Sequence, residues 1–211
     1  KYLKSFFIAK FIWHTSPFTT EFPRLSPFMK KFLAICLLSV ASHVYAGPKV
    51  EFKTSLGDFV VEVNPEKAPK TVENFLGYVN GGFYDGTIFH RVINNFMVQG
   101  GGFTQDMQQK STKAPIPLES QNGLNNVLYS IAMARTSIPD SATAQFFINV
   151  VNNKNLDYPR PDGHGYAVFG MVIKGTETID KIKAVSTTRK GPFADLPVTP
   201  IVIKSAKVIG K

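Results

Sequence analysis

One arginine of this chain lies in a segment whose neighbouring residues are mostly apolar. The segment runs from Phe89 to Phe103 with the sequence FHRVINNFMVQGGGF, and Arg91 is followed by Val92 and Ile93. Removing a guanidinium from water is costly, so a charge among apolar groups needs a partner or a function. Because this group is always charged and its N–H donors form a fixed fork, it can hold an electron-rich atom in one place. Arg91 is therefore the first candidate for a functional residue.

The segment predicts two short strands joined at Asn94 and Asn95, which tolerate left-handed turn conformations, and three glycines that let another backbone come close. A two-residue turn would pair Arg91 with Val98. A three-residue loop would pair Arg91 with Gln99, because residues directly opposite each other share a face. Spacing alone leaves both registers open, and an ordinary half-buried ribbon with Arg91 in solvent fits the pattern too.

The rest of the chain predicts further short strands and two short helices. Alternation and β-branched residues indicate strands at Lys49 to Thr54, Asp58 to Val63, Val127 to Arg135, Gln145 to Val151, Tyr166 to Ile173 and Val198 to Ile209. Helical spacing indicates helices from Thr71 and over Glu177 to Val185. A loop from Thr104 to Asn126 carries a strand near Ile116 to Glu119. Without alternating strand and helix units, an antiparallel sheet that closes on itself is expected.

Several other chemistries lack the residues they need. From position 47 onward the chain has no cysteine and only His90 and His164, so a zinc site or a Cys–His nucleophile would lack ligands, and no metal is expected. His90 is expected to face the interior of the barrel. Residues 47–211 contain 18 basic and 14 acidic residues, a formal charge of +4 that is scattered along the chain. A nucleic-acid surface is therefore not expected.

The first 46 residues predict an upstream extension and a signal peptide. Residues 1–28 show no sustained period and predict no fold, whereas residues 29–46 carry two lysines, an apolar run from Phe32 to Val40 and a small-residue cleavage signal. The apolar run is shorter than the roughly 20 residues of a membrane span. We therefore expect cleavage after Ala46, a periplasmic protein and no stable membrane insertion.

The motifs together resemble the cyclophilin family of peptidyl-prolyl isomerases. FHRVINNFMVQGGGF, SIAMART, QFFINVV and GYAVFG occur in the family's order and at suitable spacing. The resemblance implies that residues 47–211 form one mainly β domain, a closed antiparallel eight-stranded β-barrel with two short capping α-helices. It also implies the three-residue register and an enzyme that needs no cofactor. The chain looks most similar to the bacterial periplasmic members.

The resemblance implies a set of site residues. Arg91 is the expected catalytic residue. The positions expected to bind the proline-containing substrate are Phe96, Met97, Gln99, Ala134, Gln145, Phe147, Leu156 and Tyr166. Asn155 and Tyr166 depart from many family members, which have tryptophan and histidine there, and this puts strong binding of cyclosporin-type inhibitors in doubt. Taken singly, Met97, Phe147 and Leu156 would be ordinary core residues.

Two functions remain open at this stage. The preferred one is a monomeric isomerase that accelerates the folding of exported, proline-containing polypeptides and needs only to bind the twisted amide better than either planar isomer. The other is a peptide-binding or chaperone-like module on the same scaffold, in which turnover is incidental. An isomerase assay on a short X-Pro peptide distinguishes them.

Overall fold

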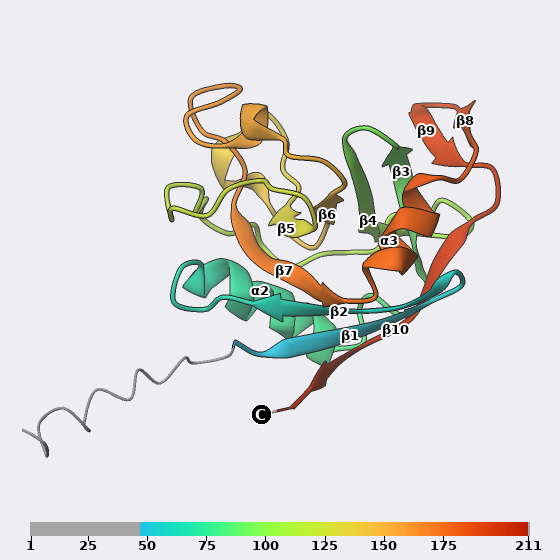
Figure 1. The fold of residues 1–211 in the computed structure, drawn as a ribbon, viewed down its shortest axis with the longest axis horizontal. Coiled ribbons are helices and arrows are strands. Elements are labelled where there is room, and N and C mark those ends of the chain that lie inside the picture. Colours follow the sequence, from blue (N-terminus) through green and yellow to red (C-terminus); the bar gives the residue numbers. More distant parts are fainter. Residues whose placement is uncertain (1–46, 211) are drawn as a thin grey trace, which may run out of the picture. The chain divides into compact units, whose positions relative to one another are not determined.

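Ten strands and two α-helices, with the loops that join them, make up residues 47–210, which are the residues that the computed structural model describes (Figure 1). The strands are β1 (Lys49–Thr54), β2 (Gly57–Val63), β3 (Thr87–Ile93), β4 (Met97–Thr104), β5 (Ser130–Met133), β6 (Phe146–Asn149), β7 (Val168–Lys174), β8 (Thr187–Lys190), β9 (Phe193–Pro197) and β10 (Ile201–Ile209). The helices are α2 (Pro69–Asn80) and α3 (Thr176–Lys183), with short 3₁₀ turns at Pro139–Ser141 and Lys154–Leu156. The predicted extension and signal peptide lie outside the described residues.

Eight of these strands close into a barrel. Its order is β1-β10-β3-β4-β6-β5-β7-β2, and every pair is antiparallel. Closure leaves no unpaired sheet edge among these eight strands. The remaining two strands, β8 and β9, form a separate ribbon that lies beside β3 (Figure 1). The predicted closed antiparallel barrel with two helices is confirmed.

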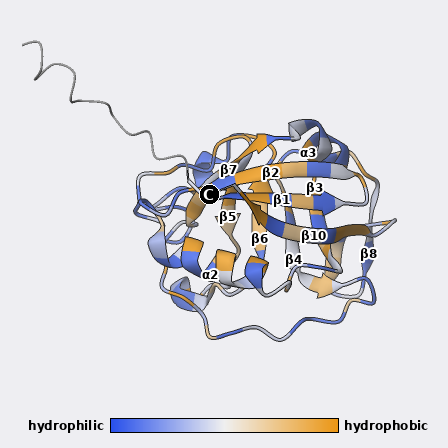
Figure 2. Ribbon diagram, turned by 90° about the horizontal axis from the view of Figure 1, so that it is seen from below, coloured by the Kyte–Doolittle hydropathy of each residue, from blue (hydrophilic) through white to orange (hydrophobic). Residues whose placement is uncertain are grey.

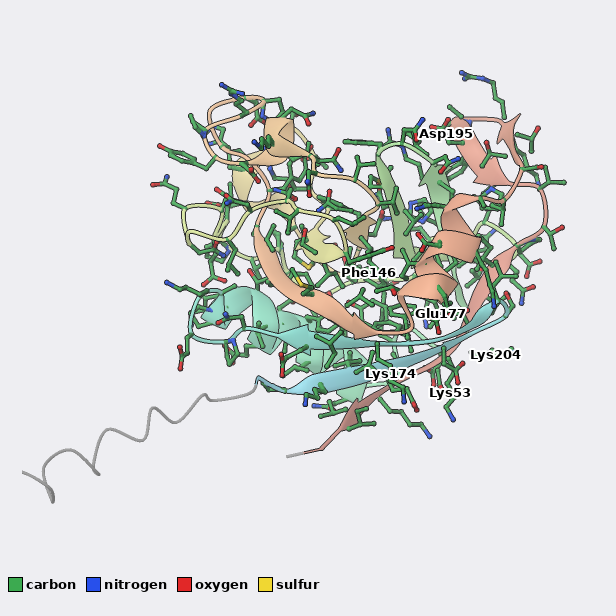
Figure 3. The ribbon with its side chains drawn as sticks, in the orientation of Figure 1. Lys53, Phe146, Lys174, Glu177, Asp195 and Lys204 are labelled. Atoms are coloured by element: carbon green, nitrogen blue, oxygen red, sulfur yellow. The ribbon has the colours of Figure 1, made fainter. Side chains whose placement is uncertain are left out.

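The interior of the barrel is filled by aromatic and branched side chains. Phe52 and Phe59 stack with ring centroids 4.9 Å apart, and Phe146, labelled in Figure 3, packs against Phe52 and Phe75. Burying a side chain of this size contributes roughly 1.5 to 3 kcal/mol to the free energy of unfolding. A domain without cysteine can therefore be stabilised by its core alone.

Helix α2 begins two residues before the predicted start because Pro69 suits the first turn of a helix. No side chain of the helix caps its N-terminus. Instead, the Glu119 carboxylate accepts hydrogen bonds from the backbone N–H of Lys70 at 3.0 Å and of Thr71 at 2.8 Å. A distant loop thereby satisfies donors that have no partner inside the helix. Figure 2 shows apolar and polar bands alternating around α2, as expected of a helix with one buried face.

Helix α3 lies apart from α2, near β2, β3 and β4 (Figure 1). Its Ile179 and Ile182 are fully buried in the barrel core, as predicted, and Val185 just beyond it packs against that core. Neither helix of the described segment is long and apolar enough to cross a membrane.

Some predicted strands are shorter than expected. The segment near Ile116 contributes a single bridge to Ala142 and not a strand, so that prediction is wrong. β5 begins at Ser130 because Val127 and Leu128 are partly exposed and lie in a turn before the barrel. β10 begins at Ile201, because Val198 pairs with Ser186 at the end of the β8–β9 ribbon and Pro200 lacks an N–H.

Gly101 allows two aromatic rings to approach the backbone of β4. Its φ is +80°, and a Cβ there would lie 2.8 Å from Tyr84 Cε1 and 2.9 Å from Phe146 Cε1. We predict that Gly101→Ala lowers the free energy of unfolding by about 2 kcal/mol or more, from the left-handed backbone and from overpacking together. Gly123→Ala is the control in urea denaturation, because Gly123 has φ +79° but open space around it. If both variants lost the same free energy of unfolding, the rings of Tyr84 and Phe146 would not contribute to the cost at Gly101.

Candidate active site

The β3–β4 hairpin adopts the three-residue register. Arg91 pairs with Gln99, Val92 with Val98 and Ile93 with Met97. The Phe96 N–H donates to the Ile93 carbonyl at 3.0 Å and closes the loop. Arg91 and Gln99 therefore lie side by side on one face of the hairpin. The register implied by the family resemblance is confirmed.

Neighbouring strands add an apolar surface outside the barrel core. On β6, Phe146 and Ile148 belong to the core, whereas Phe147 belongs to a second buried cluster that includes Met97 and Leu156. Alternation along the strand produces this division, since successive side chains point to opposite faces. The outward face of β4 and β6 thus carries a small hydrophobic cluster of its own.

A cavity of about 100 Å³ opens over this second cluster. It is lined by Arg91, Phe96, Met97, Gln99, Ala134, Arg135, Phe147, Leu156 and Tyr166. A water molecule occupies roughly 30 Å³ in the liquid, so the cavity admits a group the size of a small ring. Eight of the nine predicted site residues line it. Asn155, next to Leu156, is exposed.

Gln145 is the predicted site residue that does not line this cavity. Its Oε1 accepts a hydrogen bond from Gln99 Nε2 at 2.9 Å. Gln145 therefore holds the Gln99 amide, and Gln99 is the one of the two that faces the cavity. The structure brings both amides together, but it places them in different roles.

Asp195 on β9, labelled in Figure 3, forms an ion pair with Arg91, which lines the cavity. Its Oδ2 is 3.7 Å from Arg91 Nε, and the two side chains are 34% and 45% exposed. The pair restricts the orientation of the guanidinium. This residue could not be predicted from the sequence, because β9 shows no regular apolar alternation: its two buried residues, Leu196 and Pro197, are adjacent.

We predict that Asp195→Asn lowers kcat by a factor of about two to five, since an exposed ion pair contributes roughly 0.2 to 1 kcal/mol. The amide can no longer attract the guanidinium as a charge does, so Arg91 samples more orientations. Steady-state kinetics with an X-Pro peptide measure the effect. An unchanged kcat at low salt would contradict the orienting contribution, and Asp140→Asn, in an exposed position on another loop, serves as the control.

A chain of buried amides fixes the wall formed by Phe96 and Leu156. Asn153 Nδ2 donates to the Phe96 carbonyl and to Asn149 Oδ1, each at 2.7 Å. Asn149 Nδ2 in turn donates to Ser130 Oγ at 2.9 Å. Buried polar groups with their partners in place define one arrangement of the backbone. The 3₁₀ turn that carries Leu156 is thereby tied to the β3–β4 loop.

Arg135 lines the cavity but could not be predicted as a site residue from the sequence. Only Ala134 of the motif SIAMART was expected to contribute, and nothing in the local sequence distinguishes Arg135 from a surface arginine. Its partner Asp162 lies 27 residues away in an irregular loop, at a distance of 2.7 Å from Nη2. The contact depends on tertiary structure and has no local signature.

His90 is buried but does not face the barrel interior, so that expectation is wrong. Its ring contacts Phe103 at a centroid distance of 4.7 Å and Phe193 at 6.2 Å, and the second of these lies on β9 outside the barrel. The pKa of His90 is lowered from 6.5 to about 4, mainly by burial and in smaller part by the neighbouring Arg91 charge. The imidazole beside Arg91 is therefore neutral at neutral pH.

The arrangement is suited to binding and polarising an amide. It combines two permanent cations, Arg91 and Arg135, with one amide and an apolar slot. Within residues 47–210 no group of three or more His, Cys, Asp or Glu side chains is placed to hold a metal ion. A substrate with a small ring beside an amide bond matches these features. Donors at the rim would act on the amide while the slot holds the ring.

Comparison with known proteins agrees with this geometry. A family model described as "Cyclophilin type peptidyl-prolyl cis-trans isomerase/CLD" matches residues 49–208. The isomerase cyp18 of Streptomyces antibioticus is 60% identical over 163 residues, 76% of this chain and 98% of that protein. Peptidyl-prolyl cis-trans isomerase A of Dickeya dadantii is 52% identical, covering 85% and 94%. Isomerase B of Escherichia coli is 52% identical, covering 75% and 98%.

Solved structures show the same fold. A cyclophilin type isomerase of Cryptosporidium parvum, crystallised in the presence of the dipeptide Ala-Pro, superposes with a TM-score of 0.64 at 25% identity. The likeness covers 77% of this chain and 99% of that one.

Proposed function

This chain belongs to the family of cyclophilin-type peptidyl-prolyl cis-trans isomerases, and on that basis we propose how its site works and which proteins it serves. The activity is rotation about the bond that precedes proline. In the proposal, Arg91 is the catalytic residue and exported, incompletely folded polypeptides are the substrates. The observation that supports the mechanism is the cavity, which has Arg91 at its rim and apolar side chains as its walls.

Rotation about an X-Pro bond is slow because amide resonance opposes it. The barrier is about 18 to 20 kcal/mol, and the uncatalysed event takes tens of seconds or longer. Nothing has to be protonated, attacked or reduced during the reaction. Bringing it into milliseconds requires about four decades in rate, or roughly 5 to 6 kcal/mol of preferential stabilisation of the twisted amide.

Arg91 supplies that preference. When the amide twists, the prolyl nitrogen becomes pyramidal and regains a lone pair, which the planar isomers do not offer. Because Asp195 pairs with Nε, the terminal nitrogens of the guanidinium are left to donate to this lone pair. A charged donor aimed at an atom that becomes electron-rich only in the transition state raises kcat.

The apolar walls hold the proline ring while its neighbouring bond rotates. Phe96, Met97, Phe147, Leu156 and Tyr166 surround the ring, and Ala134 leaves room for the chain beside it. Gln99, held by Gln145, donates to a substrate carbonyl and fixes the peptide on the other side of the bond. One half of the substrate is thus held while the other turns.

The experiment that tests this function is a protease-coupled isomerase assay on the purified protein with an Ala-Pro peptide. We expect acceleration that depends on the proline and saturates with peptide. Binding of the peptide without any acceleration would overturn the mechanism. N-terminal sequencing of the exported protein tests the proposed periplasmic role, for which processing before Gly47 is expected, and size exclusion tests the proposed monomer.

A further inference from the structure

The guanidinium of Arg135 is buried and held by four hydrogen bonds. The side chain is only 1% exposed. Its Nε donates to the Gly165 carbonyl at 2.9 Å, its Nη1 to the Thr136 carbonyl at 2.9 Å, and its Nη2 to both carboxylate oxygens of Asp162 at 2.8 and 2.7 Å. These partners fix the plane of the group, because the donors of a guanidinium form a rigid fork. A charge so fully engaged is unavailable for roles that need it free.

The face of this guanidinium covers the ring of Tyr166. The central carbon of Arg135 lies 4.6 Å from the ring centroid, within the range of a cation–π contact. Phe147 contacts the same ring edge to face, with centroids 5.5 Å apart at 82°. Tyr166 is therefore held between Arg135 and Phe147, and all three line the cavity.

The contacts of Arg135 connect the packed side chains of Tyr166 and Phe147 to the loop of residues 158–164, which makes few other contacts. Residues 158–164 are exposed, and Tyr166 at the end of the loop is only half-buried. The backbone of Tyr166 is held by one hydrogen bond, from its N–H to the Leu156 carbonyl at 3.0 Å. That bond places the Cα but leaves the ring free to choose its rotamer. Arg135 and Phe147 supply the contacts that select one rotamer.

We propose that Arg135 is a positioning residue that determines the affinity of the proline slot by holding Tyr166 as its wall. The inference rests on the proposed function of the cavity and deepens it. The proline ring keeps its shape while the bond before it rotates, so a wall contacts it equally in the ground state and the transition state. Loss of such a contact raises KM and leaves kcat unchanged, whereas loss of Arg91 lowers kcat.

The first test is steady-state kinetics of Arg135→Gln, in which the fork and the charge are lost. We expect KM to rise about fivefold with kcat within a factor of two, which corresponds to losing one cation–π contact and its ordering effect. Arg135→Lys keeps the charge but cannot form the bidentate pair, so it should show most of the same rise. Full recovery in the lysine variant, or a fall in kcat at constant KM, would overturn the proposal.

Asp162→Asn provides a milder test that does not depend on tolerating a change inside the site. Asp162 is exposed, so the variant should fold, yet it loses the bidentate partner of Arg135. A KM between those of the parent and Arg135→Gln is expected. Arg160→Gln in the same exposed loop is the matched control and should leave both constants unchanged. If the KM of Asp162→Asn equals that of the parent protein, the proposal that Asp162 and Arg135 together hold the Tyr166 ring is contradicted.

A double-mutant cycle shows whether Arg135 acts through Tyr166. The effects of Arg135→Gln and Tyr166→Leu on KM should be strongly non-additive, because removing the ring removes what Arg135 positions. Additive effects would overturn the proposal. The ring resonances of Tyr166 in NMR spectra should also shift in Arg135→Gln without any substrate. The NMR shift tests whether Arg135 holds the Tyr166 ring even if the site does not bind proline. A failure of this proposal can therefore be distinguished from a failure of the proposed function.

Discussion

Arg91→Ala is expected to lower kcat by about two to three decades while KM changes little. A donor that acts only in the transition state contributes roughly 3 to 4 kcal/mol when it lies in a preorganised site. The apolar walls that bind the ring, including Phe147 and Leu156, remain in place. The variant should therefore still bind the peptide but should isomerise it far more slowly. The coupled assay gives kcat and KM, and isothermal titration gives the affinity for the peptide.

The protein should fold normally in this variant. Arg91 is 45% exposed at its side chain, and an exposed ion pair such as the one with Asp195 contributes roughly 1 kcal/mol or less to stability. Arg91→Lys is the informative companion, since it keeps the charge but loses the fork. We expect it to recover only part of kcat. Undiminished turnover in Arg91→Ala would show that the guanidinium is not the catalytic group.

The part of the site that lies on regular elements could be predicted from the sequence. Alternation places Phe147 and Phe146 on opposite faces of one strand, and the structure puts them in two separate clusters. The register of the hairpin could not be predicted from the residues alone. Asn94 and Asn95 are compatible with both loop lengths, so only the family resemblance selected the pairing of Arg91 with Gln99 that the structure shows.

The contacts that orient the site residues could not be predicted. Asp195 and Arg135 both act through partners distant in sequence, one on the ribbon β8–β9 and the other across an irregular loop. The ribbon shows no apolar period, because β8 is exposed throughout and the buried residues of β9 are adjacent. A charged residue in a motif resembles any other charged residue. Their importance arises from burial and proximity, which exist only in the folded chain.

The buried His90 leads to the second large effect: the free energy of unfolding should fall as the pH is lowered from about 6.5 to about 4. The folded-state pKa is about 4, because burial lowers it, while the unfolded value is 6.5. Between these values the unfolded chain binds a proton that the folded chain does not. Stability from this group is therefore complete above the unfolded pKa and is lost as the pH falls through this window.

The size of the effect follows from the difference between the two pKa values. One pKa unit corresponds to 1.36 kcal/mol, so the full loss is about 3 kcal/mol, most of it reached by pH 4.5. The environment offers the charged form little compensation. The ring contacts Phe103 and Phe193, and Arg91 repels a second positive charge. Hydrogen bonding to the Ile88 backbone and the Gln145 side chain opposes the lowering of the pKa only in part.

Urea denaturation at pH 7 and pH 4.5 measures the free energy of unfolding. Because carboxylates also titrate in this range, a variant that lacks the His90 imidazole is compared with the parent protein at both pH values. His90→Leu cannot bind a proton and keeps the apolar contacts, so its loss of stability between the two values should be smaller than the parent's by about 2 kcal/mol. His164→Gln removes a histidine from an exposed loop and should follow the parent. If His90→Leu lost as much stability as the parent on acidification, the folded protein would bind this proton over the same pH range as the unfolded chain, and burial would not lower the pKa of His90.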